Sequence, residues 1–301
     1  MNLLITGAWS DAKRHLAAIE QMGHAVRFLQ NERDPLPCDP AWVEGVVANG
    51  LFLHHPLSSF PHLRLIQLTS AGTDRVPVDE IAARGIELKT ARGVYSAPMA
   101  EYAVGGVLWL YKQASFFEAN RAAHRWEKRR DLRELCGKRV LIVGCGSVGT
   151  ACAKRFSAFD AFVTGVDVAP RTDPFFAEML PMDRLDEALE TADVAVLALP
   201  LTEKTRGLFD AARFRRMKPD AILVNISRGA VVDTDALLSA PIGGAVLDVF
   251  ADEPLPPDSP LWDRPNFLLT PHNSFVGDGN GERLKEVIFT QLKKTDKGSS
   301  K

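Results

Sequence analysis

The sequence predicts an α/β fold with two doubly wound domains, Rossmann-like or flavodoxin-like, each built on a parallel sheet, with a cleft between them. Short β-rich runs alternate with helical periodicity along the whole chain, which is the pattern of this fold class. Several runs are continuously apolar, such as VLIV at 140–143 and VAVLAL at 194–199. Strands covered by helices on both faces have this composition. The 301 residues suit two domains of ordinary size.

The elements of the first domain follow from these runs in chain order. The opening LLITGAWS resembles the start of a nucleotide-binding unit but lacks its glycine triplet. A helical pattern comes next, over 11–22. The β-rich runs of this domain are expected to be strands at 3–6, 25–29, 45–48, 65–68 and 86–89.

The second domain is expected to begin with a long apolar helix over 98–117. Its strands are predicted at 140–143, 162–166, 194–199, 222–226, 245–249 and 267–269, with helices over 148–159 and 185–190. The stretch LLSAPIGGAV leaves room only for a truncated helix before Gly243. A final helix is predicted over 281–292, and the polar tail TDKGSSK is expected to fray.

Composition limits the partners. The formal net charge is −2, and the basic stretch 121–139 also contains acidic residues, so neither nucleic acid nor an anionic membrane is expected to bind. No segment approaches the roughly 20 apolar residues that span a bilayer, and the N-terminus lacks the features of a signal peptide. The four cysteines form no CxxC pair or ligand-spaced set, so neither disulfides nor a metal site is expected. We therefore expect a cytoplasmic protein.

A GxGxxG motif indicates a dinucleotide site. Gly144, Gly146 and Gly149 follow the strand at 140–143 and open an amphipathic helix. The first glycine permits the tight turn, the second lets the backbone approach a pyrophosphate, and the third lets helix and strand pack closely. Backbone amides at the helix start, around Ser147 and Val148, would bind the phosphates. The alternative is a glycine-rich turn without a ligand.

An acidic residue closes the next strand and predicts the preferred cofactor. The carboxylate of Asp167 would accept hydrogen bonds from the adenosine ribose and repel a 2′-phosphate, which favours NAD over NADP. Arg171, four residues later, leaves some affinity for NADP open. Cys145, between the first two glycines, is expected to be a small filler rather than a nucleophile.

Three charged residues stand just past predicted strand ends, where ligands of such sheets bind. They are Arg228 in NISRG, Glu253 in LDVFADEP and His272 in LLTPH. Taken singly, each has an ordinary alternative: a structural ion pair, a solvated carboxylate or a loop cap.

Together, in this order after VGCGSVG, the three motifs resemble the D-2-hydroxyacid dehydrogenase family. Further matches cover nearly the whole chain: LTSAGTD at 68–74, PMAEYA at 98–103, LALPLTEKTRGLF at 197–209 and Trp126. The resemblance implies an NAD-dependent oxidoreductase that moves a hydride between nicotinamide and the 2-position of a small 2-keto or 2-hydroxy acid.

The resemblance also implies the site residues. Arg228 would bind the substrate carboxylate and polarise the keto oxygen, a task suited to a planar cation. His272 would be the general acid in reduction and the base in oxidation, with its ring oriented by Glu253. Backbone amides near Ala71 and Gly72 would hold the substrate carboxylate. Contacts to the cofactor are implied for Asp248, Ile226 and Ser227 at the nicotinamide, and for Leu199 and Pro200 at the adenosine half.

The family arrangement implies that 1–97 and 275–301 form a discontinuous substrate domain around an NAD-binding domain at 98–274. It also implies lobes that close to exclude water, and a homodimer formed through the helix at 98–117. Alternatives are an NAD-sensing scaffold without activity, a glyoxylate, hydroxypyruvate or phosphoglycerate type of reductase, and a formate or phosphonate dehydrogenase. Glu253 argues against formate oxidation, which pairs its histidine with glutamine. No regulatory domain follows the last helix, so we do not expect a large serine-pathway phosphoglycerate dehydrogenase.

Overall fold

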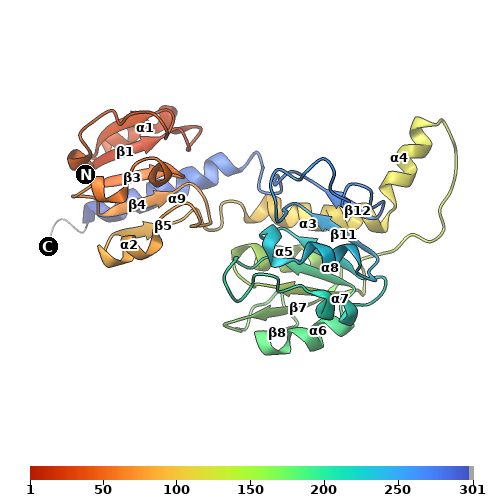
Figure 1. The fold of residues 1–301 in the computed structure, drawn as a ribbon. Helices are drawn as coiled ribbons and strands as arrows, with labels where there is room; N and C mark the ends of the chain where they lie inside the picture. The colour runs from red at the N-terminus through yellow and green to blue at the C-terminus, as the bar shows by residue number, and fades with distance from the viewer. Residues whose placement is uncertain (298–301) are drawn as a thin grey trace. The chain divides into compact units, whose positions relative to one another are not determined.

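The computed structural model describes residues 1–297, which form two α/β units (Figure 1). The first unit combines Met1–Tyr95 with the chain from Gly277 onward, and the second is Ser96–Val276. Each contains one parallel sheet covered by helices, as expected from the continuously apolar runs. Every helix in the described part of the chain is too short or too polar to span a membrane.

The sheet of the first unit has five parallel strands in the order β2-β1-β3-β4-β5. On one face the buried side chains of β1 pack against α1 and α9, including Ile5, Ile19 and Ile288. On the other face Leu4 and Ile66 pack with Ile81 of α2. The bounds are β1 Asn2–Thr6, α1 Ala12–Gln21, β2 Ala25–Leu29, β3 Gly45–Ala48, β4 Leu65–Leu68, α2 Val78–Ala83, β5 Glu87–Lys89 and α9 Asn280–Lys297.

The sheet of the second unit has seven parallel strands in the order β12-β11-β10-β9-β6-β7-β8. The order reverses between β6 and its neighbour β9, which is where doubly wound sheets bind ligands. The bounds are α3 Ser96–Tyr111, α4 Ala114–Ala122, β6 Arg139–Val143, α5 Ser147–Ser157, β7 Phe162–Asp167, β8 Glu178–Pro181, α6 Leu185–Thr191, β9 Val194–Leu197, α7 Ala211–Arg216, β10 Ile222–Asn225, α8 Thr234–Leu238, β11 Gly244–Leu247 and β12 Phe267–Leu269.

Alternate residues of β6 serve the two faces of this sheet. Val140 and Ile142 belong to a core formed with α3 and α5, whereas Leu141 and Val143 belong to a core formed with α6, α7 and α8. α3 lies so close to β11 that a Cβ atom on Gly106 would stand 2.6 Å from Val246 Cγ1. The sheet is therefore covered by a helical layer on each face.

The prediction of a single helix over 98–117 is wrong. The chain forms α3 and then α4, because Gln113 adopts a left-handed conformation with φ 53° and ends the helical path. Figure 1 shows α4 projecting from the end of α3, away from the sheet of its own unit. The tail predicted to fray from Thr295 instead begins inside α9, which continues to Lys297, and residues 298–301 lie outside the described part.

Three short elements were not predicted: α2, α7 and β8. The truncated helix expected before Gly243 is α8, Thr234–Leu238. With six and five residues, α7 and α8 are too short for a helical period to be visible. Their start signals are present, however. Asp210 accepts a hydrogen bond from the Arg213 amide, and Asp233 accepts one from the Ala236 amide, so each caps its helix.

Candidate active site

The glycine motif forms a tight turn between β6 and α5. Gly144 has φ 92°, and a Cβ atom there would stand 2.7 Å from the Leu199 nitrogen. A Cβ atom on Gly149 would stand 2.0 Å from the Gly144 oxygen. Around a Cβ atom on Gly146, by contrast, nothing lies within 4 Å. The protein itself needs the first and third glycines, whereas the second leaves open space at the start of α5.

That open space fits a pyrophosphate. The first intrahelical bond of α5 runs from the Thr150 amide to the Gly146 oxygen, at 2.9 Å. The amides of Ser147 and Val148 come before it, at the positive end of the helix dipole, where an anion binds. The turn also packs against the backbone at Leu199, at the point where the strand order reverses. Leu199 itself is buried, and the next residue, Pro200, is exposed.

Asp167 ends β7 beside this turn. Its Oδ2 accepts a hydrogen bond from the Cys145 amide at 2.7 Å, and its Oδ1 accepts one from the Ala169 amide at 3.0 Å. Arg171 approaches the same turn: Nη2 donates to the Cys145 oxygen at 2.8 Å and to Thr150 Oγ1 at 3.0 Å. The two side chains that would discriminate NAD from NADP therefore both bond the backbone of Cys145, Asp167 at its amide and Arg171 at its carbonyl oxygen.

Cys145 is buried, as expected for a filler. Burial raises the pKa of its thiol to about 12, and the nearby charge of Asp167 adds to this effect. The thiol is therefore protonated at neutral pH and is a poor nucleophile. Within residues 1–297, no cluster of histidine, cysteine or acidic side chains is arranged to hold a metal ion.

A rigid turn places Arg228 after β10. Oδ1 of Asn225 accepts hydrogen bonds from the amide and hydroxyl of Ser227, at 3.1 and 2.8 Å, and its Nδ2 donates to the Arg228 oxygen at 3.1 Å. Ile226, within this turn, is buried. A Cβ atom on Gly229 would stand 1.8 Å from the carbonyl carbon of Phe250. The segment after Arg228 thus touches the loop that leads to Glu253.

Glu253 and His272 form a hydrogen-bonded pair. Nδ1 of His272 lies 2.8 Å from Oε2 of Glu253, while Oε1 of Glu253 accepts a hydrogen bond from the Phe250 amide at 3.0 Å. The side chain of His272 is 42% exposed and that of Glu253 is 37% exposed, so a substrate can reach both. Because the carboxylate occupies Nδ1, the nitrogen left to exchange a proton with a substrate is Nε2.

Asp248 is completely buried and contacts the loop after β12 that carries His272, hereafter the histidine loop. Its Oδ1 accepts hydrogen bonds from Thr270 Oγ1 and the Asn273 amide, at 2.6 and 2.7 Å, and its Oδ2 accepts one from the Ser274 amide at 2.9 Å. These contacts to the loop were not foreseen in the sequence. The contact to nicotinamide implied for Asp248 stays a prediction.

Ala71 and Gly72 belong to the first unit, in the turn after β4. The hydroxyl of Ser70 donates to the Gly72 oxygen at 2.9 Å, and the Ser70 oxygen accepts a hydrogen bond from the Ala91 amide at 2.8 Å. The turn is thus fixed from both sides. Ala71 is exposed and Gly72 is partly exposed, which leaves this backbone accessible to a ligand.

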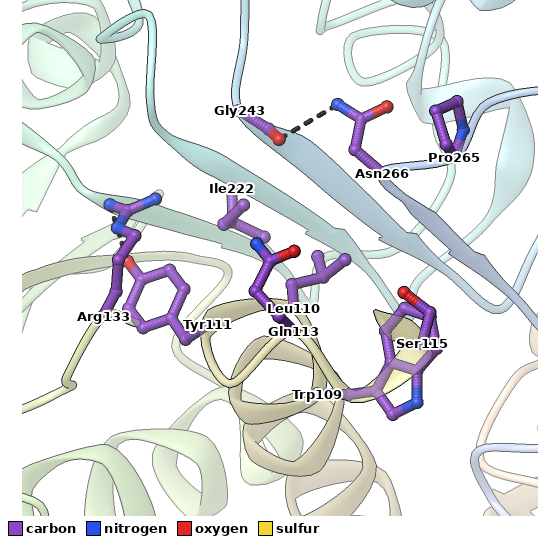
Figure 2. A pocket seen from close by; sticks show the side chains of 10 residues that line it. All are labelled: Trp109, Leu110, Tyr111, Gln113, Ser115, Arg133, Ile222, Gly243, Pro265 and Asn266. Atoms are coloured by element: carbon purple, nitrogen blue, oxygen red, sulfur yellow. Dashed lines mark hydrogen bonds between the residues drawn. The ribbon is translucent and has the colours of Figure 1, made fainter. Parts of the chain in front are cut away.

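A cavity of about 240 Å³ lies at the opposite, amino edge of the second sheet (Figure 2). Side chains from the end of α3 line it, together with Ile222 and Asn266, whose Nδ2 donates to the Gly243 oxygen at 2.9 Å. In Figure 2 Arg133 stands beside Tyr111, and its Nη2 donates to the tyrosine hydroxyl at 3.2 Å. The candidate residues Arg228, Glu253 and His272 all follow the carboxyl ends of strands, so this cavity lies at the other edge of the sheet from them.

Known proteins resemble this chain in both sequence and fold. The sequence model of a protein family, the D-isomer specific 2-hydroxyacid dehydrogenase, NAD binding domain, matches residues 104–274 of this chain. A glyoxylate reductase of Thermofilum pendens is 34% identical over 246 residues, 78% of this chain and 73% of the relative. A D-3-phosphoglycerate dehydrogenase of Mycobacterium tuberculosis is 36% identical over 225 residues, 72% of this chain but only 42% of the relative.

Two solved structures extend the match to nearly the whole chain. A D-isomer specific 2-hydroxyacid dehydrogenase family protein from Aeromonas salmonicida superposes with a TM-score of 0.83 at 30% identity, over 98% of this chain and 95% of that one. D-Lactate dehydrogenase from Aquifex aeolicus, complexed with NAD and lactic acid, gives 0.80 at 26% identity over 99% and 96%. The chain therefore belongs to the D-isomer specific 2-hydroxyacid dehydrogenase family of NAD-dependent oxidoreductases.

Proposed function

We propose that this enzyme reduces a small 2-keto acid to the D-2-hydroxy acid and catalyses the reverse reaction. The observation that carries the proposal is the 2.8 Å contact between His272 and Glu253 at the carboxyl edge of the sheet that bears the glycine turn. A histidine whose one nitrogen is held by a carboxylate is arranged to exchange a proton through the other.

Bound NADH would supply the hydride, and the chain's own residues would handle the proton and the substrate. In reduction, Nε2 of His272 donates a proton to the keto oxygen; in oxidation, the neutral ring takes that proton back. Glu253 orients the ring and stabilises its charged form. Arg228 pairs with the substrate carboxylate and polarises the carbonyl, since its guanidinium presents a planar fork of donors. Backbone amides at Ala71 and Gly72 share the carboxylate.

The cofactor would be held by residues around the glycine turn and at neighbouring strand ends. The pyrophosphate would lie on the turn and the start of α5, and Asp167 would select NAD through the ribose hydroxyls. Leu199 and Pro200 would face the adenosine half, and Ile226, Ser227 and Asp248 the nicotinamide. The residues proposed for the phosphates are Gly144, Gly146, Ser147, Val148 and Gly149.

We also propose a homodimer in the cytoplasm. The chain bears exposed apolar side chains on and after α4, with Phe117 39% and Trp126 94% exposed. A projecting helix with such side chains is a natural contact for a second copy. Light scattering of the purified protein would measure the mass, and a monomer at micromolar concentration would contradict the dimer.

Turnover tests the function directly. NADH oxidation would be followed with pyruvate, glyoxylate, hydroxypyruvate, 2-ketoisocaproate, oxaloacetate and phenylpyruvate, including the substrate classes named for the relatives. We expect activity with at least one acid, a D product where the product is chiral, and loss of activity in His272→Ala with NADH binding retained. Binding of NADH without turnover of any acid would favour an NAD-sensing scaffold instead.

A further inference from the structure

Three consecutive amides of the histidine loop bind a single residue. The His272 amide donates to the main-chain oxygen of Asp248 at 2.7 Å, and the next two amides, of Asn273 and Ser274, donate to its two carboxylate oxygens. His272 has φ 51°, a left-handed conformation that a non-glycine residue rarely adopts. Successive amides around such a residue form a concave anion site, and here the anion is the carboxylate of Asp248.

The hydrogen bonding continues from Asp248 to helix α3. Thr270 Oγ1 lies 2.6 Å from Asp248 Oδ1, and the hydroxyl of Tyr102 lies 2.6 Å from Thr270 Oγ1. A threonine has one hydroxyl proton, and an ionised carboxylate can only accept. Thr270 must therefore donate to Asp248, and Tyr102 must donate to Thr270. Burial raises the pKa of Tyr102 to about 12, so its phenol keeps the proton at neutral pH.

We infer that Tyr102 and Thr270 are positioning residues for His272, acting through the carboxylate of Asp248. The inference rests on the proposed role of His272 as the proton donor. Tyr102 is 168 residues away from Thr270 in the chain, on a helix packed against the sheet, so the chain of hydroxyls ties a rigid element to the loop that bears the imidazole. The hydroxyls fix the carboxylate of Asp248, and the carboxylate holds the amides of Asn273 and Ser274. The main-chain oxygen of Asp248 holds the His272 amide, and together these bonds fix the ring against Glu253.

The surroundings of the ring show what loosening the loop would change. Glu253 contacts Nδ1, Phe275 packs edge-on with its centroid 6.1 Å from that of the ring, and Asp248 lies beneath the backbone. Arg228 follows β10, which is separated from β12 by β11 in the sheet. A small rotation of the loop would separate the ring from Glu253, whose own position is set independently by the Phe250 amide. Both the rate and its pH dependence should therefore respond.

Variants of the two hydroxyls test the inference. Thr270→Val removes the hydroxyl and keeps the shape, and we expect kcat for keto-acid reduction to fall about tenfold, the scale of one hydrogen bond to a charged group. Thr270→Ser keeps the hydroxyl and should restore most of the rate. Tyr102→Phe should lower kcat by roughly threefold to tenfold. Because Tyr102 acts through Thr270, adding Tyr102→Phe to Thr270→Val should cause no further loss.

A matched control is available on the same helix. Tyr111 is also buried with its pKa raised to about 12 by burial, but its hydroxyl bonds Arg133 rather than the loop. Tyr111→Phe should leave kcat and its pH dependence at wild-type values. In Thr270→Val and Tyr102→Phe, by contrast, the pH at which reduction declines should move down, because a ring displaced from Glu253 holds its proton less firmly.

NMR of the imidazole gives a readout that does not need turnover. With ring-labelled histidine, the His272 signals are identified by their loss in His272→Ala, and their titration midpoint should move down in Thr270→Val and recover in Thr270→Ser. Additive losses in the double variant, or unchanged signals and rates in both single variants, would overturn the inference. If Thr270→Val fails to fold, Tyr102→Phe and Thr270→Ser still decide it. If the wild type turns over no keto acid, the proposed function fails, and the titration still tests the positioning.

Discussion

Nδ1 of His272 lies 2.8 Å from Oε2 of Glu253, although 19 residues separate them and they stand on different loops, after β12 and β11. Parallel strands bring their carboxyl ends to one edge, so two residues distant in sequence meet there. The carboxylate is also held by the Phe250 amide, which leaves its second oxygen aimed at the ring. This contact determines how the reaction should depend on pH.

Replacing Glu253 with Gln should move the pH dependence of both directions of the reaction to lower pH. Reduction needs the protonated ring and oxidation needs the neutral one. A carboxylate beside the ring stabilises the protonated form, so in Glu253→Gln the proton is lost at lower pH. Reduction should therefore begin to fail at lower pH than in the wild type, and oxidation should become available at lower pH. The measurement is kcat/KM against pH in both directions.

The control for this experiment is His272→Ala, which should depress both directions at every pH and leave NADH binding intact. Limbs of the pH profile that stay in place in Glu253→Gln would show that the observed contact does not govern proton transfer.

Replacing Arg228 with Lys should affect the substrate and spare the cofactor. Lysine keeps the charge but loses the planar fork. The drop in kcat/KM should correspond to a loss of about 2–4 kcal/mol in transition-state stabilisation, estimated from charged hydrogen bonds left unmade. The dissociation constant of NADH, measured by fluorescence, should hardly change. The melting temperature provides the control, because the turn around Asn225 should survive the substitution. Equal losses of NADH affinity and activity would assign Arg228 to the cofactor or to folding.

The two parallel sheets and the glycine turn could be predicted because they depend on local patterns. Continuously apolar runs such as 140–143 predict buried parallel strands, and the glycine motif predicts the turn that follows. The break at Gln113 could not, because glutamine carries no signal for a left-handed residue and the apolar pattern continues across it. The contact between Tyr102 and Thr270 depends on how a helix registers against a sheet, which no local pattern encodes.

Replacing Asp167 with Ser should weaken NADH and relieve the repulsion of NADPH. The loss of NADH affinity should be partly structural, because Asp167 also accepts a hydrogen bond from the Cys145 amide. The informative comparison is therefore the ratio of kcat/KM for the two cofactors, which should shift toward NADPH. Arg171→Ala provides the contrast: it removes a cation beside the same turn, so that ratio should shift toward NADH. A wild type that already prefers NADPH would contradict the assignment of Asp167.

Alanine at the second and third glycines should separate a ligand role from a structural one. A Cβ atom on Gly149 would stand 2.0 Å from the Gly144 oxygen, so Gly149→Ala should lower the free energy of unfolding by about 1–3 kcal/mol or more. A Cβ atom on Gly146 meets nothing within 4 Å, and its φ of −69° suits alanine, so Gly146→Ala should change stability by less than about 0.5 kcal/mol. The same Cβ atom would occupy the space assigned to the pyrophosphate, and NADH affinity should fall on the order of tenfold. Denaturant melts and NADH titrations of both variants measure the two effects, and unchanged NADH affinity in Gly146→Ala would place the phosphates elsewhere.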